Sequence, residues 1–315
     1  MKDQKAGQIL WGIDILGSDL GAQKGMIEFL TLWADELPLG IQPVYVMRAK
    51  SDIPAAGLAA INDQLSNTCS SEFMRAAAFP KFSPVKILIA NGVSLRARME
   101  KLLDHACATR AAAIALTTHA RSGPPRWILG SFTEALVLQS RLPLLILNPR
   151  PRTAQRLARI LFPTDFSEEA SRTLQIVIRE AKLRKLGLTI LHSAHFDFEH
   201  PEASFGPAAG RSESKADYLR KRRALLHEAV QTARTNGLAA DEVLLEDEHD
   251  LVKAILDVAN EWKADLIAMT SYCGPFAAAL GGSLTRKIIR EADCPVWAIP
   301  PESLEHVGLS GEAKP

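Results

Sequence analysis

The chain has 315 residues, of which 47% are apolar and 23% are charged. Because domains cluster at about 100–150 residues, this length predicts two domains, and the composition excludes a disordered or collagen-like chain. The 37 basic and 36 acidic residues nearly cancel, so no overall field favours nucleic acid or an anionic membrane as a partner.

Strand-like apolar runs alternate with helical segments along the first half of the chain. A helical face of Met99, Leu102, Leu103 and Ala106 follows the third run. The predicted strands are residues 8–15, 42–47, 85–90, 111–116 and 143–147. Residues 149–156 are rich in proline and arginine and have no apolar period, which predicts a linker.

The second half repeats this alternation. Leu251, Ile255, Val258 and Trp262 share a helical face after its third strand. The predicted strands are residues 159–165, 188–193, 242–246, 265–269 and 295–299. Residues 301–315 are expected to form a polar tail. Apolar strands that alternate with helices predict two Rossmann-like α/β domains, each with a five-stranded parallel sheet and flanking helices.

An internal duplication supports this division. Ile9-Leu10-x-x-x-Asp14 is answered by Ile160-Leu161-x-x-x-Asp165 at an offset of 151 residues, and the apolar run 114–117 by 267–270 at 153. Gly130-Ser131 is answered by Gly282-Ser283 at an offset of 152. The order is kept and the offset drifts little, so we predict domains at 1–150 and 157–301.

No apolar run has the length of a signal peptide or of a membrane helix, which needs about 18 residues, so we expect a soluble, cytoplasmic protein. The four cysteines, Cys69, Cys107, Cys273 and Cys294, are scattered and form no CxxC pair. Scattered cysteines of this kind favour reduced thiols over disulfides or a zinc site.

An aspartate closes the first predicted strand of each repeat, Asp14 and Asp165. In an open parallel sheet, ligands bind outside the carboxyl ends of the strands, where the strand order reverses. A carboxylate there can accept hydrogen bonds from an adenine amino group or a ribose hydroxyl. The alternative is that the aspartate caps the next helix, although Ser167 is the better cap candidate in the second repeat.

The loop after the fourth strand of the first repeat leads into the sequence GSFTE at 130–134. Gly130 permits close approach of the backbone, and Ser131-x-x-Glu134 has the spacing of a capping box. Unpaired N–H groups and the helix dipole make such a helix start a phosphate site. Gly282-Ser283 repeats the pattern in the second half.

These features resemble the universal stress protein family over nearly the whole chain, twice. The resemblance rests on the order of elements, on the Pro163-Thr164-Asp165 strand ending and on THARSGPPRWILGS after the fourth strand. ATP-binding members carry G-x2-G-x9-G-[ST]. On that pattern, the implied nucleotide-binding residues are Asp14, Thr117, Ala120, Gly130, Ser131 and Phe132 in the first repeat and Pro163, Thr164, Asp165, Thr270, Cys273, Gly282, Ser283 and Leu284 in the second.

Both repeats depart from that pattern. Thr117 and Ala120 replace the two leading glycines of the first repeat, whereas Thr270 and Cys273 replace those of the second, whose spacer is one residue short. Where such a glycine supplies positive φ, alanine costs roughly 1–2 kcal/mol, against about 8 kcal/mol for a micromolar site. The first repeat keeps the phosphate loop that is closer to the family pattern. The second keeps the closer match at the strand ending Pro163-Thr164-Asp165, which would contact the adenine base or ribose. At most one good ATP site is therefore expected.

The resemblance implies a stress-response protein that binds ATP or another adenine nucleotide, with or without Mg²⁺, and hydrolyses it slowly at most. It also implies that the two domains pair through their final strands, and it allows a further homodimer. One alternative is a nucleotide-free interaction module whose clefts take a partner protein or another small ligand. Another is an enzyme of the related nucleotide α-hydrolase or adenylating class, although the chain has no Walker, GxGxxG or GxSxG motif.

Two further clusters are interpreted without a ligand. Residues 192–200 hold three histidines and two acidic residues, but their spacing is not helical and Pro201 follows. We therefore expect a solvated loop there and no metal site. The basic run at 220–223 lies in a helical stretch and is expected to be a solvated face rather than a nucleic-acid site.

Overall fold

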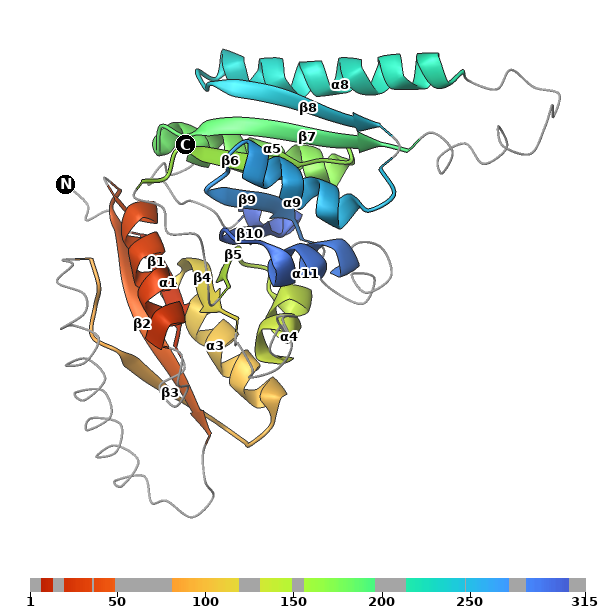
Figure 1. Ribbon diagram of the computed structural model, residues 1–315. Coiled ribbons are helices and arrows are strands. Elements are labelled where there is room, and N and C mark those ends of the chain that lie inside the picture. Colours follow the sequence, from red (N-terminus) through yellow and green to blue (C-terminus); the bar gives the residue numbers. More distant parts are fainter. Residues whose placement is uncertain are drawn as a thin grey trace, which may run out of the picture. The chain divides into compact units, whose positions relative to one another are not determined.

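The computed structural model in Figure 1 describes most of the chain. The described residues are 7–13, 20–35, 37–48, 81–118, 131–148, 156–195, 214–246, 248–271 and 282–305. The chain divides into two compact units, one formed by Met1–Arg156 with Ser271–Pro315 and the other by Leu157–Thr270. Strands alternate with helices in both units, which confirms the predicted α/β class.

The first unit is built on a sheet with the order β3-β2-β1-β4-β5-β10. Neighbouring strands from β3 to β5 are parallel, whereas β10 pairs with β5 in the antiparallel direction. Its elements are β1 (Gly7–Gly12), α1 (Leu20–Trp33), β2 (Leu39–Arg48), β3 (Lys86–Ala90), α3 (Leu95–Thr109), β4 (Ala111–Thr117), α4 (Ser131–Gln139), β5 (Leu144–Leu147), α11 (Gly282–Glu291), β10 (Val296–Ile299) and the 3-10 helix η1 (Pro301–Glu305).

Continuous apolar runs place the central strands of this unit in its core. All four residues of β5 and of β10 are buried, as expected for strands covered on both faces. On α3 the predicted face holds for Met99, Leu102 and Ala106, which are buried, while Leu103 is half-buried.

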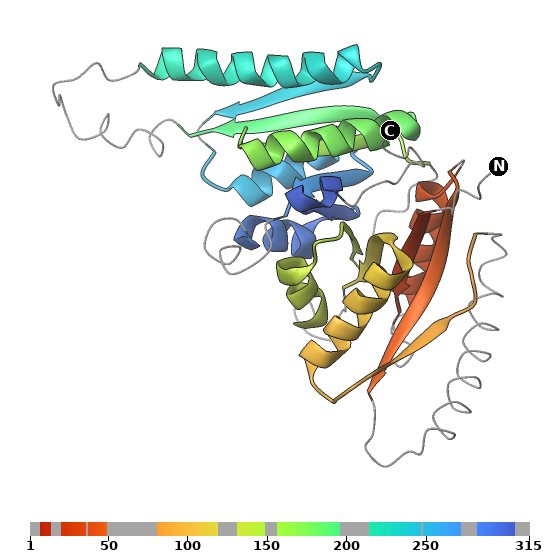
Figure 2. The same cartoon turned by 180° about the vertical axis from the view of Figure 1, so that it is seen from behind.

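The second unit has the strand order β9-β6-β7-β8, and all three neighbouring pairs are parallel. Its elements are β6 (Arg159–Pro163), α5 (Glu168–Leu183), β7 (Gly187–Ala194), α8 (Lys215–Thr235), β8 (Ala240–Glu246), α9 (Leu251–Glu261) and β9 (Leu266–Thr270). This order repeats β4-β1-β2-β3 of the first unit, as the duplication predicts. Figures 1 and 2 show α5 on one face of this sheet and α9 on the other.

The start of α5 follows from its sequence. Ser167 is the N-cap, with an extended backbone and a side-chain oxygen that accepts from the Ala170 N–H at 3.1 Å, as predicted. Glu168 and Glu169 occupy the first turn, where negative charge favours the helix dipole. The helix therefore begins directly after the strand β6 and fixes the short connection between them.

Two predictions overlap at His192, which falls both in the strand expected at 188–193 and in the solvated loop expected at 192–200. The structure confirms the strand, because β7 continues to Ala194 and His192 inside it is only 3% exposed. Its parallel pairing with β8 extends to Ala194, opposite Glu246, and keeps these residues in the sheet. Residues 196–200, the rest of the histidine-rich segment, lie outside the described residues.

None of the helices that the structure describes combines the length and the apolar character that crossing a membrane requires.

Candidate functional site

The strand order places a switch point in each unit. From β6 the chain moves outward to β7 and β8 and then returns to β9 on the other side of β6; in the first unit β1 is flanked by β2 and β4 in the same way. Ligands bind at such points, outside the carboxyl ends of the strands. The candidate sites are therefore the ends of β6 and β9 in the second unit and of β1 and β4 in the first.

Asp165 is held in a fixed position just beyond β6. Its Oδ1 accepts hydrogen bonds from the backbone N–H of Ser167 at 2.9 Å and from the Ser167 hydroxyl at 2.7 Å. The aspartate is therefore not the helix cap itself but supports the residue that is. The side chain is exposed, and within the described part of the chain its Oδ2 accepts no hydrogen bond, which leaves this oxygen open to solvent.

The backbone next to Asp165 is hydrogen-bonded to β7. Thr164 donates its N–H to the Leu191 carbonyl at 2.8 Å, and its own carbonyl lies 2.8 Å from Nδ1 of His192. Because a carbonyl oxygen only accepts, Nδ1 carries the proton of this hydrogen bond. The buried His192 thus anchors the residue next to the exposed aspartate.

Phe166 completes this turn in a conformation unusual for its residue type. Its φ is +61°, in the left-handed region that non-glycine residues seldom adopt. The Phe166 N–H bonds to Thr164 Oγ1 at 3.1 Å, and its ring lies on the His192 ring with centroids 4.3 Å apart. These contacts hold the strained backbone in place, and strained residues of this kind concentrate at functional sites.

We expect Ser167→Ala to lower the free energy of unfolding by about 0.5–2 kcal/mol, because it removes both the helix cap and a contact of Asp165. Urea denaturation would measure the loss. Ser167→Thr is the matched control, since it keeps the hydroxyl and should stay near the wild-type value. A loss that is equal in the two variants would contradict the role assigned to the hydroxyl.

The remaining predicted residues of the second repeat are divided between the units. Pro163 ends β6, and Thr270 ends the adjacent strand β9, to which β6 is paired at Leu161 and Ile267. Gly282, Ser283 and Leu284 form the first turn of α11, an element of the other unit. Cys273 lies outside the described residues.

In the first repeat the structure describes only part of the predicted site. Thr117 ends β4, and Ser131 and Phe132 form the start of α4, where the Phe132 ring lies 5.8 Å from the Arg98 guanidinium carbon. Asp14, Ala120 and Gly130 lie outside the described residues. Beyond Thr117, the buried Thr118 hydroxyl donates to Asn148 Oδ1 at 2.8 Å.

The acidic residue of the predicted capping box contacts a second helix. Oε1 of Glu134 lies 2.8 Å from Nη1 of Arg286 on α11 and 3.8 Å from Nη2 of Arg290. This carboxylate oxygen therefore joins α4 to α11. Sequence reasoning treated each helix alone and so missed this contact, although the residues' opposite charges at repeat-equivalent positions were a signal.

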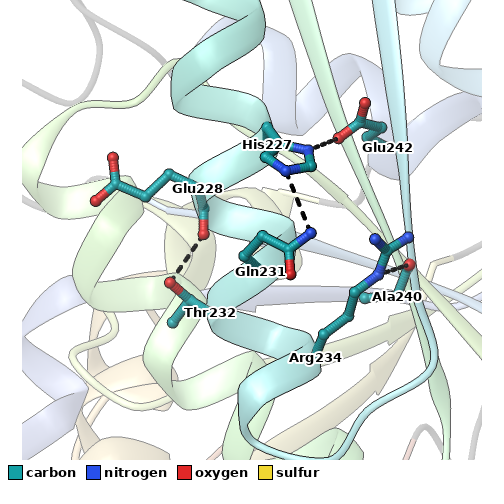
Figure 3. Close-up of polar contacts among 7 residues, drawn as sticks. All are labelled: His227, Glu228, Gln231, Thr232, Arg234, Ala240 and Glu242. Carbon is teal, nitrogen blue, oxygen red and sulfur yellow. Dashed lines mark hydrogen bonds and ion pairs between the residues drawn. The ribbon is translucent and has the colours of Figure 1, made fainter.

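A hollow lies between α8 and β8 in the second unit. It has a volume of about 660 Å³ and is lined by Leu219, Arg220, Arg223, His227, Glu242 and Glu246, with Ala216 and Ala224. Figure 3 shows His227 beside Glu242, with Nδ1 and Oε2 3.3 Å apart.

The basic side chains along this hollow have acidic neighbours. Arg223 lies 3.4 Å from Glu246, and Arg220 lies 2.8 Å from Asp217. The hollow thus offers no uncompensated positive charge to a phosphate. The basic run 220–223 follows the exposed side of α8 with Arg222 half-buried over Tyr218, as expected for a solvated face.

The described residues contain no group of three or more His, Cys, Asp or Glu side chains that could hold a metal ion. The carboxylate of Asp165 alone is too little to define such a site.

Comparison with known proteins agrees with this architecture. Residues 157–300 match the Universal stress protein family model. A universal stress protein from Archaeoglobus fulgidus is 17% identical over 96% of this chain and 100% of its own, with a TM-score of 0.65. A functionally unknown protein from Pseudomonas aeruginosa is 16% identical over 96% of both chains, with a TM-score of 0.58.

A shorter universal stress protein from Archaeoglobus fulgidus, solved in complex with dAMP, is 25% identical over 46% of this chain and 99% of its own, with a TM-score of 0.33. A search of curated proteins returned no match. The fold that extends over nearly the whole chain is therefore the α/β fold of universal stress proteins, and residues 157–300 match that family's own sequence model.

Proposed function

We propose that this chain is a cytoplasmic stress-response protein that binds ATP or another adenine nucleotide, with little or no hydrolysis. The second repeat supplies the base-side contacts of the site. The family match of residues 157–300 supports this choice, because it covers the strand β6 and the turn that carries Asp165.

The observation that carries the proposal is the setting of Asp165. Its Oδ1 is held by two hydrogen bonds from Ser167, and the side chain is exposed at a switch point of the sheet. A carboxylate fixed in this way accepts from an adenine amino group or a ribose hydroxyl without first losing side-chain freedom. Charge-assisted hydrogen bonds of this kind are among the stronger ones in proteins.

In each repeat, phosphate contacts are proposed at the start of the helix that follows the fourth strand. This helix is α4 in the first repeat and α11 in the second. Ser131, Gly282 and Ser283 stand in these first turns, where unpaired N–H groups and the helix dipole attract anions. Thr117 and Thr270 would line the phosphate side from the ends of β4 and β9, and Mg²⁺ would accompany a bound triphosphate. We assign no catalytic residue.

We also propose two domains, 1–150 and 157–301, that pair through their final strands. Support comes from the antiparallel pairing of β5 with β10, which are the fifth strands of the two repeats in chain order. The assembly then needs no second chain to complete this pairing.

A second candidate function is a nucleotide-free interaction module. Thr117 and Thr270 favour it, since both are non-glycine strand ends at the positions of the leading family glycines. The two candidates differ in one measurable property, which is the affinity of the whole chain for nucleotide.

Isothermal titration of the full-length chain with ATP and AMP tests the proposal. We expect Asp165→Ala to weaken nucleotide binding by about 10-fold to 100-fold, the loss of one or two charge-assisted hydrogen bonds. Asp257→Ala, which removes an exposed carboxylate on α9, is the matched control and should bind as the wild type does. Equal affinity in both variants, or no heat from the wild type at millimolar nucleotide, would overturn the assignment.

A further inference from the structure

The register in which β5 pairs with β10 is the one that a two-fold axis between the two repeats would produce. Leu145 lies opposite Trp297, and Trp297 is also the residue 152 positions after Leu145, which is the offset of Gly282 from Gly130. A residue that faces its own repeat-equivalent lies on the axis that relates the two repeats. The register therefore places a pseudo-two-fold axis at this pair.

The neighbouring pairs obey the same symmetry. Ile146 faces Val296, and Leu144 faces Ala298. At an offset of 152, Val296 is the equivalent of Leu144, and Ala298 is the equivalent of Ile146. The two pairs are thus images of each other across the axis.

A second contact on this axis joins α4 to α11, which lie side by side in Figures 1 and 2. Glu134 and Arg286 are again 152 positions apart, and their Oε1 and Nη1 atoms are 2.8 Å from each other. Their side chains are 32% and 24% exposed, so solvent screens this pair only in part. Two equivalent positions of the duplication therefore carry opposite charges and meet.

We propose that the Glu134–Arg286 pair makes the two repeats partners for each other rather than for a second copy of themselves. This inference rests on the domain pairing proposed above and is independent of nucleotide binding. A contact between two first repeats would place Glu134 against Glu134 on the axis, and one between two second repeats would place Arg286 against Arg286. Like charges in contact disfavour both wrong pairings, which is how interfaces exclude competitors.

Leu145 and Trp297 face each other on the axis, and their sizes also favour the pairing of a first repeat with a second repeat. Both Leu145 and Trp297 are buried, at 0% and 1% exposure. Two identical first repeats would face leucine with leucine and leave space, and two second repeats would face tryptophan with tryptophan and be overpacked. The mixed pair therefore fits this surface better than either identical pair.

One hydrogen bond adds to this asymmetry. Asn148 Nδ2 donates to the Ala292 carbonyl at 2.6 Å in a buried position. Its repeat-equivalent at an offset of 152 is Pro300, which has no donor. A pair of second repeats would therefore lack this bond on both sides of the axis.

The test is a cycle of charge reversals in the full-length chain. We expect Glu134→Arg to lower the midpoint of thermal unfolding by about 3–6 °C, because three guanidinium groups would then meet. Arg286→Glu should lower this midpoint by less, since Arg290 remains near Glu134. The double variant should recover at least half of the summed loss.

Two sets of variants complete the cycle. Reversal of Arg96 and Glu100, an exposed pair within α3, is the matched control and should show little coupling. Should a reversal prevent folding, Glu134→Gln and Arg286→Gln form a milder cycle with the same expected pattern. Additive losses at the axial pair would overturn the proposal.

Disulfide trapping tests the choice of partner directly. In the full-length Ile146→Cys, Val296→Cys variant, opposite cysteines should cross-link within one chain, as the distance between directly paired residues permits. Leu145→Cys alone should form no more covalent dimer than the wild type, which already carries four cysteines.

The outcomes separate the two proposals. Covalent Leu145→Cys dimers above the wild-type level would overturn the preference for the other repeat. Failure of the double-cysteine variant to cross-link would overturn the pairing on which that preference rests. Neither result depends on nucleotide, which is measured by the titration of Asp165→Ala.

Discussion

Replacing Glu180 by alanine is expected to lower the free energy of unfolding by about 3–5 kcal/mol. Glu180 lies on the covered side of α5, and its carboxylate forms ion pairs with Arg184 and Arg179. The side chains of Glu180 and Arg184 are both buried. Burial lowers the pKa of Arg184 and the carboxylate of Glu180 raises it, so the variant removes a carboxylate that offsets the burial of this guanidinium.

Urea denaturation of the full-length chain measures this loss. The double variant Glu180→Leu, Arg184→Met is the matched control, because replacing both members of a buried ion pair by apolar side chains is often neutral or stabilising. We expect it to recover most of the stability. If the single variant loses less than about 1 kcal/mol, the pair is solvated and the role assigned to it is wrong.

Replacing Trp297 by alanine is expected to cost about 3–5 kcal/mol of unfolding free energy, the usual loss for a large buried aromatic side chain. Trp297 lies on β10 and meets the ring of Trp33 edge to face, with centroids 5.3 Å apart. Its removal would leave a cavity where β5 and β10 pair.

The matched control is Trp262→Ala in the second unit. Trp262 is half-buried and carries the Arg159 guanidinium over its ring at 5.4 Å, so it should lose less stability than Trp297. Guanidinium denaturation followed by far-ultraviolet circular dichroism would measure both. Equal losses would contradict a central packing role for Trp297.

Much of the fold could be predicted because it follows from local patterns. Buried parallel strands require continuous apolar runs, and residues such as Ile160 and Ile267 show them plainly. The N-cap at Ser167 was also predictable, because a hydroxyl at that position satisfies the helix's own N–H groups. The duplication is matched in the structure by the strand order, since β9-β6-β7-β8 repeats β4-β1-β2-β3.

The contacts that depend on distant residues were harder to predict. His192 belongs both to a predicted strand and to a predicted polar loop, and the pairing of β8 with β7 as far as Ala194 decides for the buried strand. Glu134 has the spacing of a local cap, and that spacing does not reveal its contact with Arg286, 152 positions away. Local propensity cannot show such a contact, because tertiary packing brings the two helices together.

The candidate site was also predictable in part, where it depends on local patterns and not on contacts between distant residues. The position of Asp165 follows from the end of a strand, whereas its support by Ser167 and the tilted ring contact of Phe166 with His192 depend on how the turn folds. The phosphate side rests on helix starts in α4 and α11 and on loop positions such as Ala120 and Cys273 that lie outside the described residues. For that side the family resemblance remains the basis of the prediction.

A native mass spectrum of the freshly purified full-length protein tests nucleotide binding most directly, because it reports both the identity and the number of bound ligands. The proposed function predicts a mass increase equal to one adenine nucleotide per chain, either as purified or after addition of ATP. A spectrum that shows only the bare chain, as purified and again with ATP present at millimolar concentration, would contradict it.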